Sequence, residues 1–276
     1  MTSPNLFWPG GARLAVSFSL MFEAGGQPIS GAGGIIPDPI EGGLPDLPTN
    51  AFFEYGVYEG IPRLPDLFDK HQVKISSFMI GRAVEKAPDL AREIVSRGHE
   101  AAAHGRSWEN SYQLDPEAER RFIADGARAR STSYRAWFVY HIDEPSHDEP
   151  FIVPLKGGDF VTVPYTFHMN DIVSFPFQGW NAAAYEQALK DEFDQLYDEG
   201  AHRRRMMVVS LHDRISGHAT RARSLDRFLA YARSKTDVWF ARKDEIAKWA
   251  LEHRAETPVV RREGPEISGL PGSANS

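Results

Sequence analysis

Alternating apolar and small or polar positions mark a buried strand near the start of the chain. Residues 14–23 read LAVSFSLMFE, so Leu14, Val16, Phe18, Leu20 and Phe22 share one face. The other face carries smaller or polar side chains and ends with Glu23. This pattern predicts a strand with a carboxylate at its carboxyl end.

Strand-like and helix-like segments alternate along the rest of the chain. Residues 24–50 are dense in Gly and Pro and predict a long surface loop. Further strands are predicted over 73–80, 100–103, 138–141, 159–163 and 206–211, and helices over 61–70, 87–97, 116–130, 181–199, 224–234 and 243–253. We expect an α/β fold with a parallel sheet in one domain, residues 1–254, followed by a disordered polar tail, residues 255–276.

Composition excludes several classes of protein. Apolar residues make up 42% of the 276 positions and charged residues 25%, which is typical of a globular chain. The formal net charge of -7 disfavours nucleic acid as a partner. Without cysteine there is no disulfide, thiolate zinc site or cysteine nucleophile. No apolar run reaches the roughly 18 residues of a membrane span, so we expect a cytoplasmic protein without a membrane partner.

Three candidate catalytic groups stand at the ends of predicted strands. Glu23 ends the first strand, His104 follows the strand at 100–103, and His212 follows the strand at 206–211. Carboxyl ends of parallel strands meet at one edge of a barrel, so these side chains are expected to converge. Taken singly, the glutamate is equally consistent with a helix cap, and a lone histidine is more often structural.

Metal binding is less well supported than metal-free chemistry. A histidine four residues after His104 would complete a pair of metal ligands, but that position holds Trp108. A tight zinc site takes three protein ligands, and Glu23 and His104 supply two. We therefore expect no metal cofactor, with zinc or another divalent ion on these two residues as the alternative.

Four further polar residues are candidates for binding substrate. Asn170 and Asp171 can orient a histidine or bind an amide, although turn formation is the plain alternative. Arg214 and Arg221 can hold a carboxylate or carbonyl, although exposed arginines commonly form surface ion pairs.

Six motifs in order resemble the polysaccharide deacetylase superfamily, and within it the branch of metal-independent allantoinases and cyclic imide hydrolases. They are WPGGARLAVSFSLMFEAGG (8–26), EYG with a following helix (54–68), RGHEAAAHGRSW (97–108), VPYTFHMND (163–171), SLHDRISGH (210–218) and VWFARKDEIAKW (238–249). The resemblance implies a distorted (β/α) barrel that hydrolyses a C–N bond. It also places the acid of the metal site on Glu23, its two histidine ligands on His104 and Trp108, and the catalytic acid on His212.

Two departures from the family pattern stand out. The position of the family's catalytic base holds Met21, which can neither accept a proton nor bind such a metal ion. The chain after Ala129 is short and lacks one strand-helix unit, on the order of 30 residues. We therefore expect a barrel that is missing this unit after residue 130.

The function expected from these observations is the opening of a small cyclic amide, imide or ureide without a metal. Glu23 with His104 activates water, His212 protonates the leaving nitrogen, and Trp108 shapes a dry pocket for a flat ring. Homo-oligomers are expected because similar hydrolases often form them. Two alternatives stay open: a metal-dependent N-deacetylase of acetylated sugars in carbohydrate metabolism, and a ligand-binding relative without catalysis.

Overall fold

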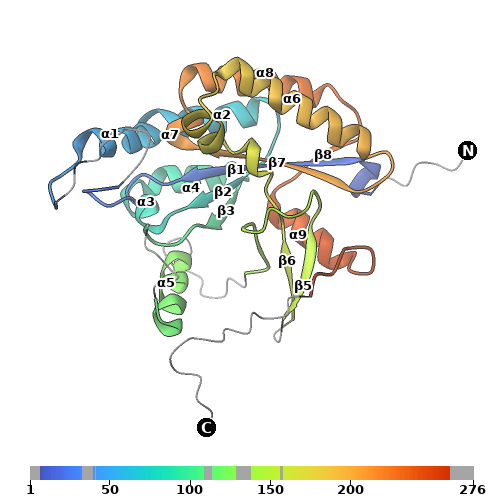
Figure 1. The fold of residues 1–276 in the computed structure, drawn as a ribbon, viewed down its shortest axis with the longest axis horizontal. Coiled ribbons are helices and arrows are strands. Elements are labelled where there is room, and N and C mark those ends of the chain that lie inside the picture. Colours follow the sequence, from blue (N-terminus) through green and yellow to red (C-terminus); the bar gives the residue numbers. More distant parts are fainter. Residues whose placement is uncertain are drawn as a thin grey trace, which may run out of the picture.

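A parallel sheet forms the centre of the molecule (Figure 1). The structure is a computed structural model that describes residues 7–32, 40, 42–108, 114–128, 138–155 and 158–261. The strands are β1 (Leu14–Phe22), β2 (Ser76–Met79), β3 (Glu100–Ala103), β7 (Arg205–His212) and β8 (Val238–Phe240). Their order is β3-β2-β1-β7, and β8 pairs with the start of β1. The predicted α/β architecture is confirmed, and the strands within the described ranges leave the barrel open.

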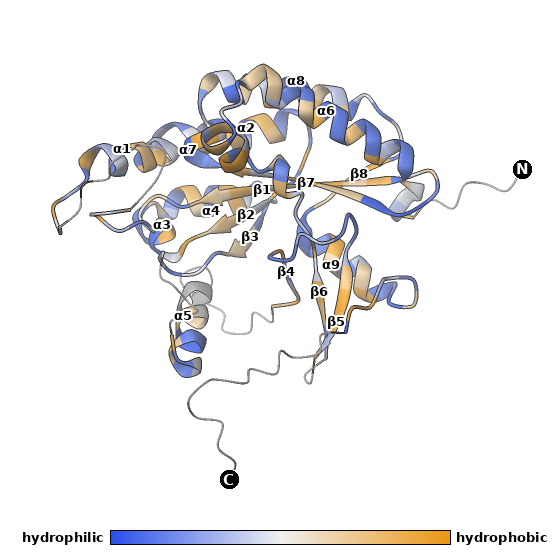
Figure 2. Ribbon diagram, in the orientation of Figure 1, coloured by the Kyte–Doolittle hydropathy of each residue, from blue (hydrophilic) through white to orange (hydrophobic). Residues whose placement is uncertain are grey.

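Helices cover both faces of this sheet. They are α1 (Leu47–Tyr55), α2 (Ile61–Lys70), α3 (Gly81–Lys86), α4 (Pro88–Ser96), α5 (Pro116–Arg128), α6 (Ala182–Glu199), α7 (Asp213–Ser216), α8 (Ala219–Arg233) and α9 (Lys243–Glu252). In Figure 1, α2, α6 and α8 lie on one side of the sheet, and α9 lies on the other. Figure 2 shows hydrophilic and hydrophobic residues mixed along α6 and α8, as in amphipathic helices with one buried face.

The two faces of β1 lie in different surroundings, as the alternation predicts. The main core contains its large apolar side chains together with those of α2, α6 and α8. Members from β1 are Leu14, Val16, Phe18, Leu20 and Phe22, all fully buried. The opposite face carries Ser17, Ser19 and Met21 toward the interior of the open barrel, and Glu23 follows directly after the strand.

A small second sheet packs with α9 on this opposite face. Its strands are β4 (Tyr140–His141), β5 (Phe151–Leu155) and β6 (Gly158–Thr162), in the order β4-β6-β5. Strand β5 is antiparallel to β6 and was not predicted. Pro154 lies inside it, and proline is tolerated there because β5 is an edge strand.

Several predicted boundaries differ from the structure. Helix α1 begins at Leu47, inside the predicted loop, because the Asp46 carboxylate accepts the backbone N–H of Thr49 and caps it. The first residues of the predicted tail pack on β5, where the N–H of Val260 donates to Ile152. Residues 129–137, where the missing unit was predicted, and residues 262–276 of the tail lie outside the described ranges.

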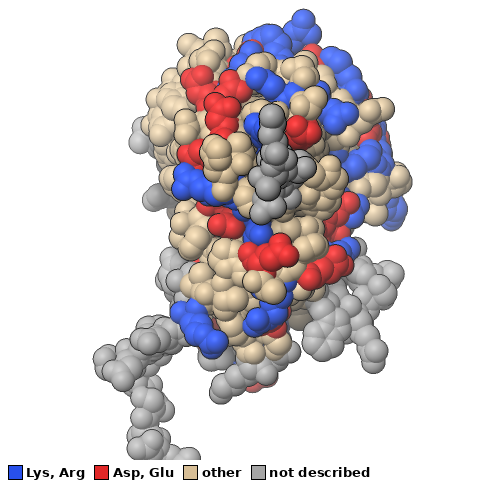
Figure 3. Space-filling view, turned by 90° about the vertical axis from the view of Figure 1, so that its right-hand side faces the viewer, with Lys and Arg blue, Asp and Glu red and all other residues tan. Residues whose placement is uncertain are grey.

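The described surface carries charged residues of both signs, as the composition suggests. On the face in Figure 3, Lys and Arg are interspersed with Asp and Glu rather than gathered in one basic patch. Among the helices of the described residues, none is long and apolar enough to cross a membrane.

Candidate active site

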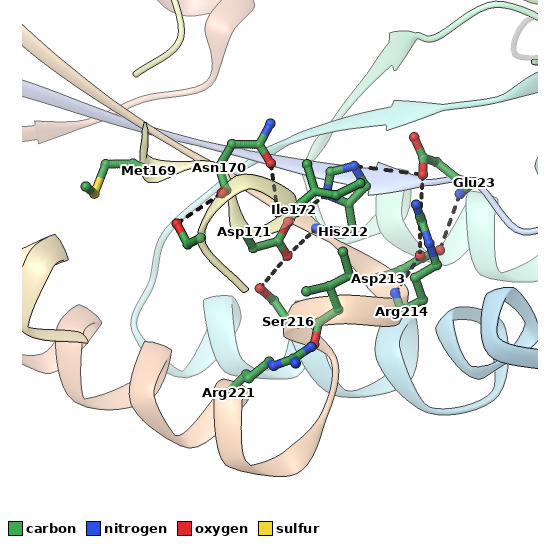
Figure 4. A network of polar contacts seen from close by, with 12 residues as sticks. Glu23, Met169, Asn170, Asp171, Ile172, His212, Asp213, Arg214, Ser216 and Arg221 are labelled. Atoms are coloured by element: carbon green, nitrogen blue, oxygen red, sulfur yellow. Dashed lines mark hydrogen bonds and ion pairs between the residues drawn. The ribbon is translucent and has the colours of Figure 1, made fainter. Parts of the chain in front are cut away.

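The carboxylate of Glu23 is the centre of a polar cluster at the carboxyl edge of the sheet (Figure 4). Its side chain is only 4% exposed because β1 lies between β2 and β7. Nε2 of His104 lies 3.1 Å from Oε1, and the guanidinium of Arg214 binds Oε2. The backbone N–H of Glu23 donates to Asp213 at 3.3 Å. Both carboxylate oxygens are therefore engaged.

His104 is the solvent-accessible member of the cluster. It follows β3, its side chain is 39% exposed, and its ring meets Phe78 edge-on, with centroids 6.2 Å apart. Because Nε2 faces the ionised carboxylate of Glu23, we assign the proton to Nε2, which leaves Nδ1 as the basic atom.

His212 is buried at the end of β7 and is held by Asp171. Its Nδ1 lies 2.6 Å from one oxygen of Asp171, and its backbone N–H donates to the other at 2.7 Å. Asp171 also accepts the hydroxyl of Ser216 at 2.6 Å. With Nδ1 bound to a carboxylate, Nε2 is turned toward Glu23, 3.9 Å from Oε2. The three predicted groups therefore converge on Glu23, and His212 has a second carboxylate, Asp171, on its other ring nitrogen.

The surroundings fix the charge states of this cluster. Burial disfavours the charged form of Glu23, yet its pKa lies well below the ordinary value of a glutamate. The groups responsible are His212, His104 and Arg214. Burial also disfavours charged His212, but Asp171 and Glu23 raise its pKa above 6.5. Glu23 is thus ionised and a weak proton acceptor, whereas His212 readily holds a proton near neutral pH.

Arg214 lies inside the cluster rather than on its surface. Its side chain is 3% exposed and its guanidinium is bound to Glu23, so it is not open to a substrate carboxylate. Asp213 beside it is fully buried, and burial raises the pKa of this carboxyl to about 7 although Arg214 opposes the shift. The substrate-binding role predicted for Arg214 does not fit this placement.

Trp108 borders the cluster, with its ring centroid 5.6 Å from the guanidinium carbon of Arg214. Its indole ring meets Phe53 of α1 edge-on, with centroids 5.1 Å apart, and is partly exposed. The backbone N–H of Trp108 donates to Gly26 at 2.9 Å, which ties it to the loop after β1.

Asn170 and Arg221 point away from Glu23 and take structural contacts. The side-chain oxygen of Asn170 accepts the N–H of Ile172 at 3.2 Å, which is the turn-forming alternative. Arg221 donates to the carbonyl of Ile215 at 3.1 Å and lies over Phe175. In Figure 4 it lies beyond Ser216, away from Glu23. Neither residue contacts the catalytic cluster through the interactions described.

Similarity to known proteins identifies the family of this chain. Residues 50–132 match the polysaccharide deacetylase family model. A solved probable polysaccharide deacetylase from Pseudomonas aeruginosa PAO1 is 30% identical, with a TM-score of 0.81 over 91% of this chain and 94% of that chain. The chain belongs to the polysaccharide deacetylase family. A solved PuuE allantoinase is also 30% identical, with a TM-score of 0.80 and the same coverage of both chains. A peptidoglycan deacetylase from Helicobacter pylori is 38% identical over 144 residues, 48% of this chain and 46% of its own length.

The zinc site of metal-dependent deacetylases does not fit the residues of this family member. The second histidine ligand is replaced by Trp108, whose indole nitrogen only donates hydrogen bonds. Of the two remaining candidate ligands, Glu23 has one carboxylate oxygen already bound by the cationic guanidinium of Arg214. The described part of the chain contains no group of three or more His, Asp or Glu side chains that could hold a metal ion.

Met21 lies where the resemblance places the family's base. In the sheet it pairs with His212 on one side and Phe78 on the other, and it is buried. Its thioether has no basic atom, so proton acceptance must come from another residue.

Sequence reasoning missed Asp213 and Phe53 as members of the site. Asp213 directly follows His212 at a strand end, which is a usable signal for a buried carboxylate. Phe53 arrives from α1, after the long loop, and no local pattern connects it to Arg214.

Proposed function

We propose that this deacetylase-family member hydrolyses a C–N bond other than a peptide bond, in a small cyclic amide, imide or ureide, without a metal. The observation that carries the proposal is the meeting of Glu23, His104 and His212, with Nε2 of each histidine directed toward the same carboxylate. One histidine is exposed and the other is buried, which suits the two different proton transfers of hydrolysis.

Water activation is assigned to His104, oriented by Glu23. The low pKa of Glu23 makes its carboxylate a weak base but a good partner for an imidazolium. In this step Nδ1 of His104 takes a proton from water, the water oxygen attacks the substrate carbonyl carbon, and Glu23 stabilises the imidazolium. This refines the expectation that Glu23 with His104 activates water.

We assign the protonation of the leaving nitrogen to His212. Asp171 holds Nδ1–H, so the proton on Nε2 is the one that can be donated. That N–H first stabilises the tetrahedral oxyanion, and the proton moves to the ring nitrogen as the C–N bond breaks and its electron pair goes to nitrogen. The raised pKa of His212 supports its role as the acid.

A flat, activated ring fits the aromatic border of the site better than an acetamido sugar. The partly exposed ring of Trp108 stands beside the catalytic cluster and offers surface for stacking, and the buried ring of Phe53 packs against it. Without a metal to polarise the carbonyl, a strained or electron-poor ring lowers the demand on the site. The similarity to an allantoinase supports this substrate class.

The test is a hydrolysis assay with succinimide, hydantoin, allantoin and a chitooligosaccharide. We expect turnover of at least one ring, and its loss in Glu23→Gln and His212→Ala. His168→Ala is the matched control, because His168 also pairs with a carboxylate, Glu192, but lies on the surface. Undiminished rates in both site variants, with a ring substrate turned over, would reject the assignment.

A second candidate is a metal-dependent N-deacetylase of acetylated sugars. The similarity of about half the chain to a peptidoglycan deacetylase favours it. Hydrolysis of the chitooligosaccharide that requires added zinc, with all three rings untouched, would support this candidate over the first. Binding of a ring without hydrolysis of any substrate would instead support a non-catalytic relative.

A further inference from the structure

Arg214 lies beside Glu23, where a carboxylate-bound cation would sit. Its guanidinium binds Oε2 of Glu23, and its side chain is almost fully buried. The guanidinium carbon lies 4.1 Å from the ring centroid of Phe53 and 5.6 Å from that of Trp108. A desolvated cation over aromatic rings is attracted more strongly than an exposed one, so the charge is held in place from several sides.

A second carboxylate fixes the backbone of this arginine. Asp213 accepts the N–H of Arg214 at 2.6 Å, and one of its oxygens lies 3.9 Å from the guanidinium. Asp213 in turn packs on Gly56, where an added Cβ would come within 2.4 Å of its carboxyl carbon. Arg214 is therefore held at its backbone by Asp213 and at its head group by Glu23.

This arrangement competes directly with a divalent cation. An ion on Oε2 of Glu23 would lie next to the guanidinium, and like charges at such short range repel strongly when water is excluded. An ion bound between Oε1 of Glu23 and Nε2 of His104 would have only these two protein ligands, because Trp108 stands at the third position, and it would still lie close to the guanidinium.

We infer that Arg214 is the resident cation of this site: it takes the place of the family's metal ion, balances the charge of Glu23 and keeps divalent ions out. Trp108, at the position of the missing ligand, is then a neighbour of this cation. The aromatic ring that removes the ligand also helps to hold the arginine. Arg214 is a positioning residue in this scheme, and the inference does not depend on which substrate the enzyme takes.

The first test is metal binding to the natural chain. Wild type and Glu23→Gln are titrated with Zn²⁺ by calorimetry and with Co²⁺ by visible absorption. We expect no binding that differs between the two proteins. One equivalent of either ion that binds wild type and is lost in Glu23→Gln would overturn the inference.

The second test is a thermal double-mutant cycle of Arg214→Met and Glu23→Gln. Arg214→Met removes the permanently charged partner of buried Glu23 and leaves only the two histidines beside it, so we expect Tm to fall by about 10 °C. Adding Glu23→Gln removes that charge, and we expect it to restore about half of the loss. Equal Tm values for Arg214→Met with and without Glu23→Gln, or a further fall in the double variant, would overturn the inference.

Arg204→Met is the matched control for this cycle. Arg204 is also buried, lies over Trp249 and pairs with Glu149, but it is remote from the site. Its Tm loss should simply add to that of Glu23→Gln. The metal titration needs only the natural chain and Glu23→Gln, so it can still overturn the inference if Arg214→Met does not fold. Neither test measures hydrolysis, so their outcome is separate from that of the proposed function.

Discussion

Replacing Lys243 by Met measures how strongly a buried charge beneath the catalytic cluster weakens the fold. Lys243 begins α9 and is fully buried on the sheet face that carries Ser17. Its ammonium donates to the hydroxyl of Ser17 at 3.3 Å and lies 5.7 Å from the ring centroid of Phe78. Burial lowers the pKa of Lys243 from 10.5 to about 7, although Glu100 opposes the shift.

The magnitude follows from these two pKa values. Between pH 7 and 10.5 the folded chain binds fewer protons at Lys243 than the unfolded chain, so wild-type stability rises with pH across this window. At pH 7 the lysine lowers the free energy of unfolding by about 4 kcal/mol. Loss of the hydrogen bond to Ser17 offsets about 1 kcal/mol of the gain. Lys243→Met should therefore be more stable by about 3 kcal/mol at pH 7, and this advantage should vanish near pH 10.5.

Urea denaturation at one-unit steps from pH 6 to 10 gives the free energies of unfolding directly. Lys248→Met is the matched control, because Lys248 lies on the same helix but is largely exposed and pairs with Asp244. The free energy of unfolding of Lys248→Met should change with pH in the same way as that of wild type. A Lys243→Met chain that is less stable than wild type at pH 7, or a difference that does not change with pH, would refute the reasoning.

Three further predictions concern the site. Asp171→Asn should lower kcat by about 100-fold or more with little change in KM, because Asp171 orients His212 and contacts no substrate. An unchanged kcat in steady-state kinetics would contradict this. The kcat/KM profile should fall on the basic side above pH 6.5, since His212 must be protonated and its pKa is raised; a flat profile to pH 10 would exclude it as the acid. Trp108→Ala should raise KM for a flat ring by up to about tenfold while Tm changes by only a few degrees, as calorimetry would show.

Local rules predict the frame of the site well. The period-2 alternation of residues 14–23 defines both β1 and the position of Glu23. Parallel strands end at a common edge, so His104 and His212 could be placed beside Glu23 from their positions after predicted strands.

Contacts between distant segments could not be predicted in the same way. The residues next to Arg214 in the sequence do not indicate its partner. The contact with Glu23, 191 positions away, arises only in the folded chain. Phe53 reaches the guanidinium because Asp46 caps α1 at the end of the Gly/Pro-rich segment, and no periodic signal marks that approach. Edge strand β5 was missed for a different reason, because Pro154 argues against a strand unless its edge position is known.

The close contacts between Asp213 and three glycines have a consequence for tolerance to substitution. At Gly60 and Gly217 an added Cβ would come 2.1 Å from the carbonyl oxygen of Asp213, and at Gly56 it would strike the carboxyl group. Substitution of any of these three glycines should therefore be as damaging as substitution of Glu23, His104 or His212, although glycine has no reactive side chain. In a saturation library of this chain, loss-of-function alleles should cluster at these glycines, and a reader of that map alone would mistake a steric requirement for chemistry.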